Sequence, residues 1–178
     1  MSQFVEIDLI ASSDTYRELL RGLNQEAGIR ISTGSGEPLA FVLLDFPTTW
    51  SFSQLAEMNS VDRARTVVVI QGRHNAYSDL IASYHVSGVV PVVDQGTLVS
   101  CIYAAAASMR TYTWQSGLTY MELRVSRLLL QGYDTSTVAD ALKVSTKTVN
   151  AHISNAIGKL GYDSRAQYIA AMLSSHHA

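Results

Sequence analysis

The first 110 residues alternate between short apolar runs and segments whose apolar residues recur at helical spacing. Three of the runs, 40–44, 66–70 and 89–93, are nearly continuous, which indicates strands that are buried on both faces. The five predicted strands are 5–10, 29–32, 40–44, 66–70 and 89–93. The predicted helices run from about 14 to 28, over 52–58, over 76–84 and over 97–109. This alternation predicts an α/β domain, a doubly wound, parallel, five-stranded sheet covered on both faces.

The connection between the second and third predicted strands is unusually short. Only residues 33–40 lie between Ser32, at the end of the second strand, and Phe41 in the third, and they include Gly34, Gly36 and Pro38. A parallel crossover with its helix needs roughly ten to twelve residues. We therefore expect this helix to be missing or reduced to one turn, which leaves one flank of the sheet open to a partner or a second subunit.

From residue 118 onward the pattern changes to short helices that begin with small oxygen-bearing side chains. Thr119, Asp134 and Ser145 each precede an apolar helical pattern and can accept a bond from a first-turn amide. Two of these helices, near 135–142 and 146–160, are joined only by residues 143–145, as in a helix-turn-helix. A fourth helix is expected over 163–173. The second half is therefore predicted to be an all-α domain of four helices.

The motif positions of this half match those of the LuxR/FixJ type of DNA-binding domain. The matching residues are Leu118, Thr119, Glu122, Leu129, Gly132, Val138, Ala139, Leu142, Ser145, Thr148, Val149, His152, Lys159, Leu160 and Gly161. So many positions in register over some fifty residues are a far more specific signal than a bare helix-turn-helix pattern. The resemblance implies a transcriptional regulator that binds double-stranded DNA.

The resemblance also implies roles for individual residues of the second helix of the pair. Lys147, Thr148 and Lys159 match positions that contact phosphates, and Ser145 is expected to be mainly a helix cap. Asn150, Ala151 and Ser154 occupy positions that often read bases in this family. Lys is frequent there at the first and last of these positions, so Asn150 and Ser154 change the expected preference, and Asn favours adenine. The fourth helix resembles the one through which DNA-bound domains pair.

The first half resembles the receiver domain of two-component response regulators, which commonly precedes such a DNA-binding domain. By that resemblance Asp45, at the end of the third predicted strand, is the candidate phosphoacceptor. The Mg²⁺-binding acids of a receiver are replaced by Ala11 and Ser12, its Thr or Ser by Gln71, and its Lys is absent. We therefore interpret this half as a pseudo-receiver. The alternative for Asp45 is that it caps the turn that follows it.

Composition and charge support two domains with different partners. The 178 residues are 47% hydrophobic and 16% charged, which suits residues 1–110 as one domain, 111–117 as a linker and 118–178 as another. Residues 1–117 hold seven Arg and no Lys against eleven acids, a net of -4, whereas residues 118–178 hold six cations against four acids, a net of +2. The positive net charge of residues 118–178 suits a partner such as DNA. Because this charge is small, we expect a homodimer that binds with two recognition helices.

Other features limit the remaining functions. The single Cys101 cannot form an internal disulfide, and the sequence contains neither a long apolar span nor a signal-like N-terminus. A cytoplasmic location is expected. No stretch combines a nucleophile, a base and an orienting residue, so no enzyme, cofactor or metal is expected. The four alanines 104–107 favour the last helix of the first domain as a dimer surface, or else they pack on their own sheet.

Three hypotheses for function remain open. The first is a DNA-binding regulator controlled independently of phosphorylation, through dimerisation, a small-molecule ligand or a regulatory protein. The second is a conventional response regulator switched by phosphorylation of Asp45. The third is a protein-interaction module or anti-regulator whose DNA affinity is weakened, for which the modest charge is the motive.

Overall fold

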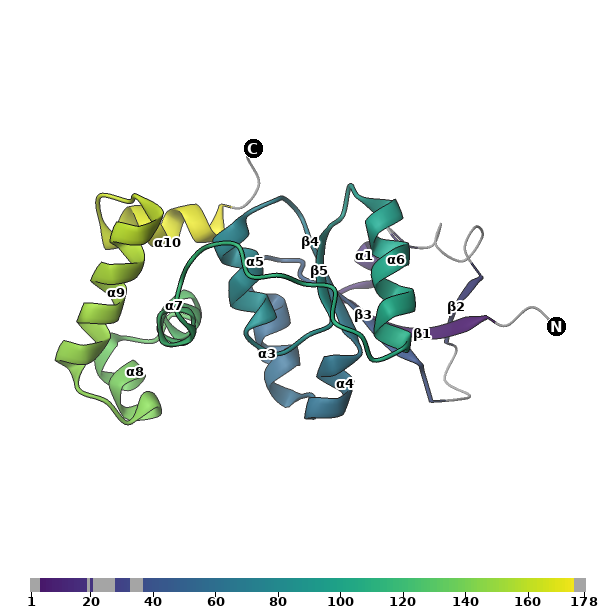
Figure 1. Cartoon of the computed structure of the whole chain (residues 1–178), viewed down its shortest axis with the longest axis horizontal. Helices are drawn as coiled ribbons and strands as arrows, with labels where there is room; N and C mark the ends of the chain where they lie inside the picture. The colour runs from purple at the N-terminus through teal and green to yellow at the C-terminus, as the bar shows by residue number, and fades with distance from the viewer. Residues whose placement is uncertain (1–3, 19, 21–27, 33–36, 175–178) are drawn as a thin grey trace.

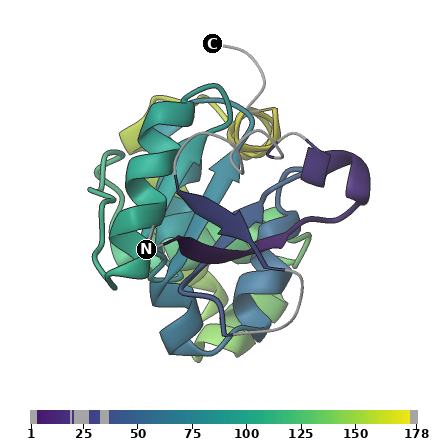
Figure 2. The same cartoon turned by 90° about the vertical axis from the view of Figure 1, so that its right-hand side faces the viewer.

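The structure, a computed structural model, describes residues 4–18, 20, 28–32 and 37–174. Its first domain is built on a five-stranded, entirely parallel sheet in the order β2-β1-β3-β4-β5, shown edge-on in Figure 1 and turned by 90° in Figure 2. The strands are β1 (Val5–Ile10), β2 (Ile29–Ile31), β3 (Ala40–Leu44), β4 (Thr66–Ile70) and β5 (Gly88–Pro91). The predicted doubly wound sheet is confirmed.

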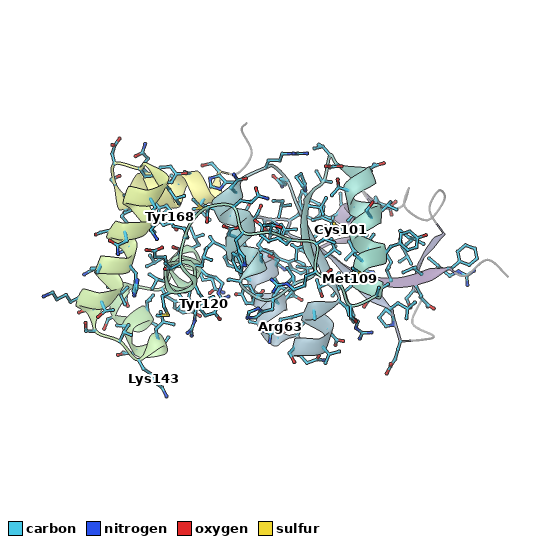
Figure 3. All side chains as sticks on the ribbon, in the orientation of Figure 1. Arg63, Cys101, Met109, Tyr120, Lys143 and Tyr168 are labelled. Carbon is cyan, nitrogen blue, oxygen red and sulfur yellow. The ribbon has the colours of Figure 1, made fainter. Side chains whose placement is uncertain are left out.

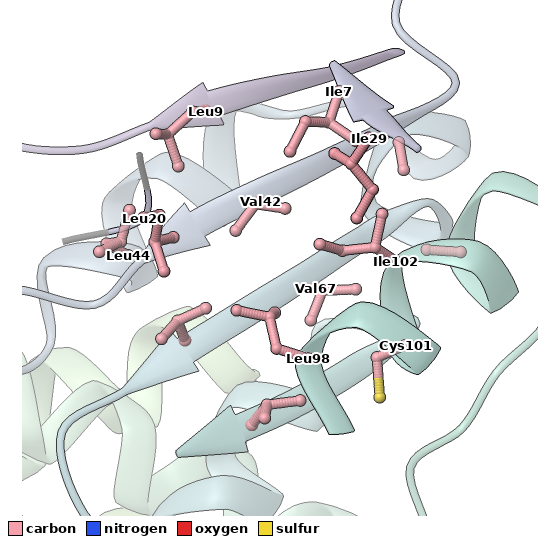
Figure 4. Close-up of a cluster of buried hydrophobic side chains, with 14 of the residues drawn as sticks. Ile7, Leu9, Leu20, Ile29, Val42, Leu44, Val67, Leu98, Cys101 and Ile102 are labelled. Atoms are coloured by element: carbon pink, nitrogen blue, oxygen red, sulfur yellow. The ribbon is translucent and has the colours of Figure 1, made fainter. Parts of the chain in front are cut away.

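Helices cover both faces of this sheet. They are α1 (Asp14–Glu18), α3 (Trp50–Glu57), α4 (Ser60–Ala64), α5 (Asn75–Ala82) and α6 (Gln95–Ala106). One face packs against α6 and Tyr16 of α1, and the hydrophobic cluster there includes Ile7, Val42 and Ile102 (Figure 4). The other face packs against α3 and α5, and all five residues of β4 are buried. Burial on both faces explains why the central strands are continuous apolar runs.

The end of β5 differs from the prediction. The predicted strand 89–93 ends at Pro91, and Val93 is 80% exposed. The chain turns here because the Asp94 amide donates to the Pro91 carbonyl, and the Asp94 side chain then accepts the Thr97 amide and caps α6. The helix predicted over 97–109 consequently begins two residues earlier, at Gln95.

The short connection between β2 and β3 contains no helix among its described residues, 32 and 37–39. Residues 33–36 of this connection, and the predicted helix end near residue 28, lie partly or wholly outside the described residues. The backbone returns to the sheet through the Leu39 amide, which donates to the Glu6 carbonyl. Phe4, just before β1, and Leu39, just before β3, are exposed large apolar residues, and the open flank stays a prediction.

The second domain consists of four helices, α7 (Tyr120–Leu130), α8 (Thr135–Leu142), α9 (Thr146–Leu160) and α10 (Arg165–Leu173). All three predicted caps are present, because Thr119, Asp134 and Ser145 accept the amides of residues 122, 137 and 148. Between α8 and α9, Lys143 has a φ of 56° and its side chain points into solvent (Figure 3). The pair forms the predicted helix-turn-helix.

The two domains meet at α5, which lies between the sheet and α7 (Figure 1). Leu123 of α7 and Tyr168 of α10 belong to the same hydrophobic cluster as Leu80 and Tyr84. A separate, smaller cluster of Val125, Val138, Ile153 and their neighbours holds α7, α8 and α9 together. Within the described part of the chain, none of the helices is both long and apolar enough to cross a membrane.

Candidate nucleic-acid interface

One face of α9 is exposed and carries the residues predicted to meet DNA. Lys147, Asn150, Ala151 and Ser154 are all exposed and follow one another at the three- and four-residue spacing of a single helical face. The opposite face, with Val149, Ile153 and Ala156, is buried against α7 and α8. The helix-turn-helix therefore presents a polar, cationic surface, and Figure 1 shows α8 and α9 on the side of α7 remote from the sheet.

Ser145 and Thr148 set the beginning of this helix. The Ser145 hydroxyl accepts the Thr148 amide at 3.0 Å, and the two hydroxyl oxygens are 2.8 Å apart. Ser145 is thus a helix cap, as predicted. Thr148 is half-buried and shares its hydroxyl with the cap, and its phosphate contact stays a prediction.

Lys159 lies apart from the other predicted DNA contacts. It is twelve residues after Lys147, about 18 Å along the helix. Its ammonium donates to Glu122 of α7 at 2.8 Å and to the Gly117 carbonyl at 3.4 Å. Glu122 is 3% exposed and also accepts the Thr119 amide. The geometry gives Lys159 a structural partner, and its phosphate contact also stays a prediction.

The pKa of Glu122 reflects this arrangement. Burial alone would raise the pKa, but the hydrogen bonds from Lys159 and Thr119 outweigh burial, and the pKa is lowered. Glu122 therefore stays ionised where it closes the capping box of α7. The Thr-x-x-Glu and Lys positions of the motif are thus two ends of one contact between α7 and α9.

Asp45 is buried where the sheet meets α3 and α5. It is 2% exposed, its Oδ1 accepts the Ser51 amide at 2.8 Å, and its Oδ2 accepts the Thr49 amide at 3.3 Å and the Tyr77 hydroxyl. Burial raises the pKa of Asp45, although these bonds counter it, and burial followed by the charge of Asp45 raises the pKa of Tyr77. The alternative prediction, that Asp45 caps the following turn, is confirmed.

The surroundings of Asp45 contain few of the groups that a phosphoacceptor needs. Ala11 and Ser12 follow β1, and the Ser12 hydroxyl donates to the Phe46 carbonyl. Gln71 follows β4. In the described ranges of the chain, no three His, Cys, Asp or Glu residues are grouped so as to hold a metal ion. Both oxygens of Asp45 are already engaged, so a phosphodonor would have to displace these bonds.

Sequence reasoning missed the polar residues at the domain junction. Asp79 on α5 is 1% exposed and accepts bonds from Tyr112, Gln115 and Ser116. Arg127 of α7 lies over the ring of Tyr84. A signal for Asp79 existed, because it interrupts the apolar helical segment 76–82, where an acid is out of place unless it is bonded.

A parallel five-stranded domain in this strand order, followed by a four-helix domain with a helix-turn-helix, is the fold of two-domain response regulators. The family model for luxR-family bacterial regulatory proteins matches residues 116–172. The spore germination protein GerE of Bacillus subtilis (strain 168) is 45% identical over 56 residues, which cover 32% of this chain and 76% of GerE. The chain therefore belongs to the LuxR family of bacterial regulatory proteins.

Solved structures show the same fold over both domains. The structure of two RcsB dimers bound to two parallel DNAs has a TM-score of 0.56 at 14% identity, covering 98% of this chain and 100% of that chain. The RcsB response regulator of Salmonella typhimurium has a TM-score of 0.53 at 14% identity, covering 99% and 100%. At this identity the likeness shows the fold alone.

A third relative is an enzyme. The release factor glutamine methyltransferase of Pasteurella multocida (strain Pm70) is 30% identical over 108 residues, or 60% of this chain. The chain spans only 36% of that enzyme's length. This overlap is too small a part of the enzyme to assign the chain to its family.

Proposed function

We propose that this protein is a sequence-specific DNA-binding transcriptional regulator whose recognition element is α9. The observation that carries the proposal is the exposed face of Lys147, Asn150, Ala151 and Ser154. It is held by a helix-turn-helix and left uncovered by the first domain (Figure 1). Membership of the LuxR family and the fold shared with DNA-bound RcsB support it.

The residues of α9 divide between positioning and reading. Lys147 stands in the first turn and is suited to a phosphate, next to the amides of the helix start. Asn150, Ala151 and Ser154 are suited to base edges, where a bidentate contact contributes about 1–3 kcal/mol of discrimination. Asn150 is the position at which adenine would be preferred.

DNA binding as a homodimer follows from the modest charge of the second domain. A net charge of +2 gives a single DNA-binding domain little non-specific affinity for DNA. A dimer whose two recognition helices bind the two halves of one site would bind more tightly than a monomer. On α10, Ala166, Ala170 and Leu173 are exposed at helical spacing, and so are Tyr103 on α6 and Ala107 at its C-cap. These are the faces that we assign to pairing, in line with the dimers of RcsB on DNA.

Control independent of phosphorylation is the second part of the proposal. It is supported by the buried, fully bonded Asp45 and by the uncharged Ala11 and Ser12 beside it. Dimerisation, a small ligand or a regulatory protein would then supply the signal. Ordinary phosphorylation of Asp45 is the competing function, which the response-regulator fold favours.

Selection of bound genomic fragments by the purified full chain tests DNA binding. We expect enriched fragments with a shared motif and a salt-dependent mobility shift. Lys147→Ala with Asn150→Ala should weaken the shift roughly tenfold or more, because a phosphate contact and a base contact are lost. Arg110→Ala, a change of exposed charge in the first domain, is the matched control and should leave affinity unchanged.

Other outcomes separate the alternatives. Fragments bound equally well by the double variant would point to the anti-regulator or interaction module. If acetyl phosphate or beryllofluoride with Mg²⁺ changed the dimer fraction of wild type but not of Asp45→Asn, control by phosphorylation would be favoured instead.

A further inference from the structure

The linker, residues 111–117, is bonded to α5 rather than loosely spanning the two domains. The Asp79 carboxylate accepts the Tyr112 hydroxyl at 2.6 Å, the Gln115 amide at 3.1 Å and the Ser116 amide at 2.7 Å, and it also accepts the Ser116 hydroxyl. Two side chains and two backbone amides of one short segment therefore converge on a single buried group. The path of the linker across α5 is visible in Figure 1.

The burial of Asp79 makes sense only with the linker in place. A carboxylate that is 1% exposed is costly unless its oxygens are bonded, and Tyr112, Gln115 and Ser116, which bond these oxygens, all belong to the linker. The hydrogen bond from Tyr112 is secure, because burial and the bond to Asp79 both raise the pKa of Tyr112 and keep it protonated. Linker and helix are thus mutually dependent.

The entry of the linker is fixed as well. The Thr111 amide donates to the Ser87 carbonyl at 2.8 Å, and Thr111 Oγ1 lies against Gly88 of β5. A Cβ at position 88 would come within 2.7 Å of that oxygen. The absence of a side chain at Gly88 therefore provides the space in which the linker departs from the sheet.

Two further contacts attach the second domain at the two ends of α5. At its N-terminal end, the Tyr162 hydroxyl is 3.4 Å from His74 Nε2. At its C-terminal end, the Arg127 guanidinium donates to Ser83 Oγ at 3.0 Å and lies 3.8 Å from the centre of the Tyr84 ring. With Asp79 between them, α5 is bonded to the linker and the second domain along its whole length.

We propose that Asp79 is a positioning residue that fixes the orientation of the DNA-binding domain and thereby sets the separation of half-sites that a dimer recognises. The orientation that it fixes leaves the recognition face of α9 exposed. The proposal rests on the proposed function, since a half-site spacing exists only for a protein that binds DNA as a dimer.

The contrast with a free linker gives the size of the effect. Seven unrestrained residues would have a root-mean-square reach of about 15 Å, or roughly four base pairs. Two such domains would accept a range of half-site separations. The bonds between Asp79 and the linker form a clasp. If this clasp holds each DNA-binding domain to the first domain of its own chain, the dimer accepts one half-site separation, set by the pairing of the first domains.

The test uses full-length protein with two kinds of variant. Asp79→Asn keeps the shape but removes the charge, and Tyr112→Phe with Ser116→Ala removes two donors while leaving the carboxylate and both backbone bonds. The control is Asp94→Asn, an acid that caps α6 through the Thr97 amide and pairs with Arg73, neither of which belongs to the linker. Hydrogen exchange and small-angle scattering are measured without DNA, then affinity for selected half-sites, single or paired at different separations.

Without DNA, we expect the Gln115 and Ser116 amides to lose about tenfold or more of their protection in Asp79→Asn, with a larger maximum dimension in scattering. Both changes should be smaller in the double variant and absent in Asp94→Asn. On DNA, affinity for a single half-site should persist while preference among separations flattens. A merely structural residue would weaken all sites equally.

Unchanged protection of both amides in Asp79→Asn would overturn the clasp. Freed amides with an unaltered spacing preference, or a wild type without any preference, would overturn its role in specificity. A wild type that bound no DNA would instead refute the proposed function, while exchange and scattering would still decide whether the clasp exists.

Discussion

The Asp45 carboxylate accepts hydrogen bonds from the amides of Thr49 and Ser51 and from the hydroxyl of Tyr77. It ties β3 to the start of α3 and to α5, which also carries Asp79. The sequence predicted a phosphoacceptor or a cap for this residue; the hydrogen bonds confirm the cap, and the phosphoacceptor role stays a prediction. The sequence could not predict the burial of Asp45 or its bond to Tyr77, because these two residues are 32 positions apart along the chain.

Asp45→Asn should lower the free energy of unfolding by about 1–3 kcal/mol, because one acceptor is replaced by a donor facing buried donors. Burial raises the pKa of Asp45 in the folded state above its ordinary 3.8. Protonated Asp45 therefore stabilises the folded wild type at low pH, and this contribution to the free energy of unfolding declines as the pH rises through the folded pKa. The difference between wild type and variant should therefore narrow with rising pH, as measured by urea unfolding from about pH 4.5 to about pH 7.5.

Asp94→Asn serves as a control of opposite sign. Hydrogen bonds from Thr97 lower the pKa of this exposed acid, so the stability it contributes is lost as the pH falls. The effect of Asp94→Asn on the free energy of unfolding should therefore change only below the ordinary pKa of 3.8 and stay constant over the range in which Asp45→Asn is followed. If the Asp45→Asn difference also stayed constant over that range, the bonds would stabilise the carboxylate more than burial penalises it.

At the scale of elements, the contact between Glu122 and Lys159 joins α7 to α9. Lys159→Met should lower the free energy of unfolding by about 1–3 kcal/mol at neutral pH, because a buried carboxylate loses a charged donor. Since bonds lower the pKa of Glu122, this stability is present above the ordinary 4.5 and is lost as the pH falls. The loss caused by the variant should shrink in acid, as unfolding measured across that range would show.

The same variant decides whether Lys159 also touches DNA. A lost phosphate contact lowers the slope of log affinity against log salt by about 1. We expect that change for Lys147→Met, and also for Lys159→Met if its predicted phosphate contact forms. A reduced slope for both would place Lys159 on a phosphate in spite of its bond to Glu122.

Elements were the best-predicted level of this structure, because their signals are local. Thr119, Asp134 and Ser145 mark helix starts by a bond that spans three residues, and 40–44 and 66–70 are continuous apolar runs. The prediction failed at Val93, where the run continues but the backbone turns at Asp94. The apolar character of a run alone does not predict where the backbone turns.

At the scale of the whole molecule, α5 contributes to a hydrophobic cluster that includes residues of both domains. Leu80 is fully buried there, so Leu80→Ala should cost about 2–5 kcal/mol and lower the thermal midpoint of both domains together. Hydrogen exchange of β4 and α9 reports the two domains separately. The sequence could not predict this junction, since its partners, such as Arg127 and Ser83, are far apart along the chain.

Val138→Ala is the comparison for the whole-molecule prediction. Val138 is fully buried in the cluster confined to α7, α8 and α9. It should affect the exchange of α9 more than that of β4. If Leu80→Ala left α9 as protected as in wild type, the domains would unfold independently despite their shared cluster.

The glycine at position 88 has an evolutionary consequence. Because Thr111 Oγ1 occupies the space that any side chain at 88 would need, substitutions at these two positions are not independent. A residue larger than glycine at 88 requires Thr111 Oγ1 to move, through another rotamer of Thr111, a smaller residue at 111 or a rerouted linker. Exchange of the DNA-binding domain between relatives would then succeed most readily when strand, linker and α5 are inherited together, so the unit of recombination is larger than the domain.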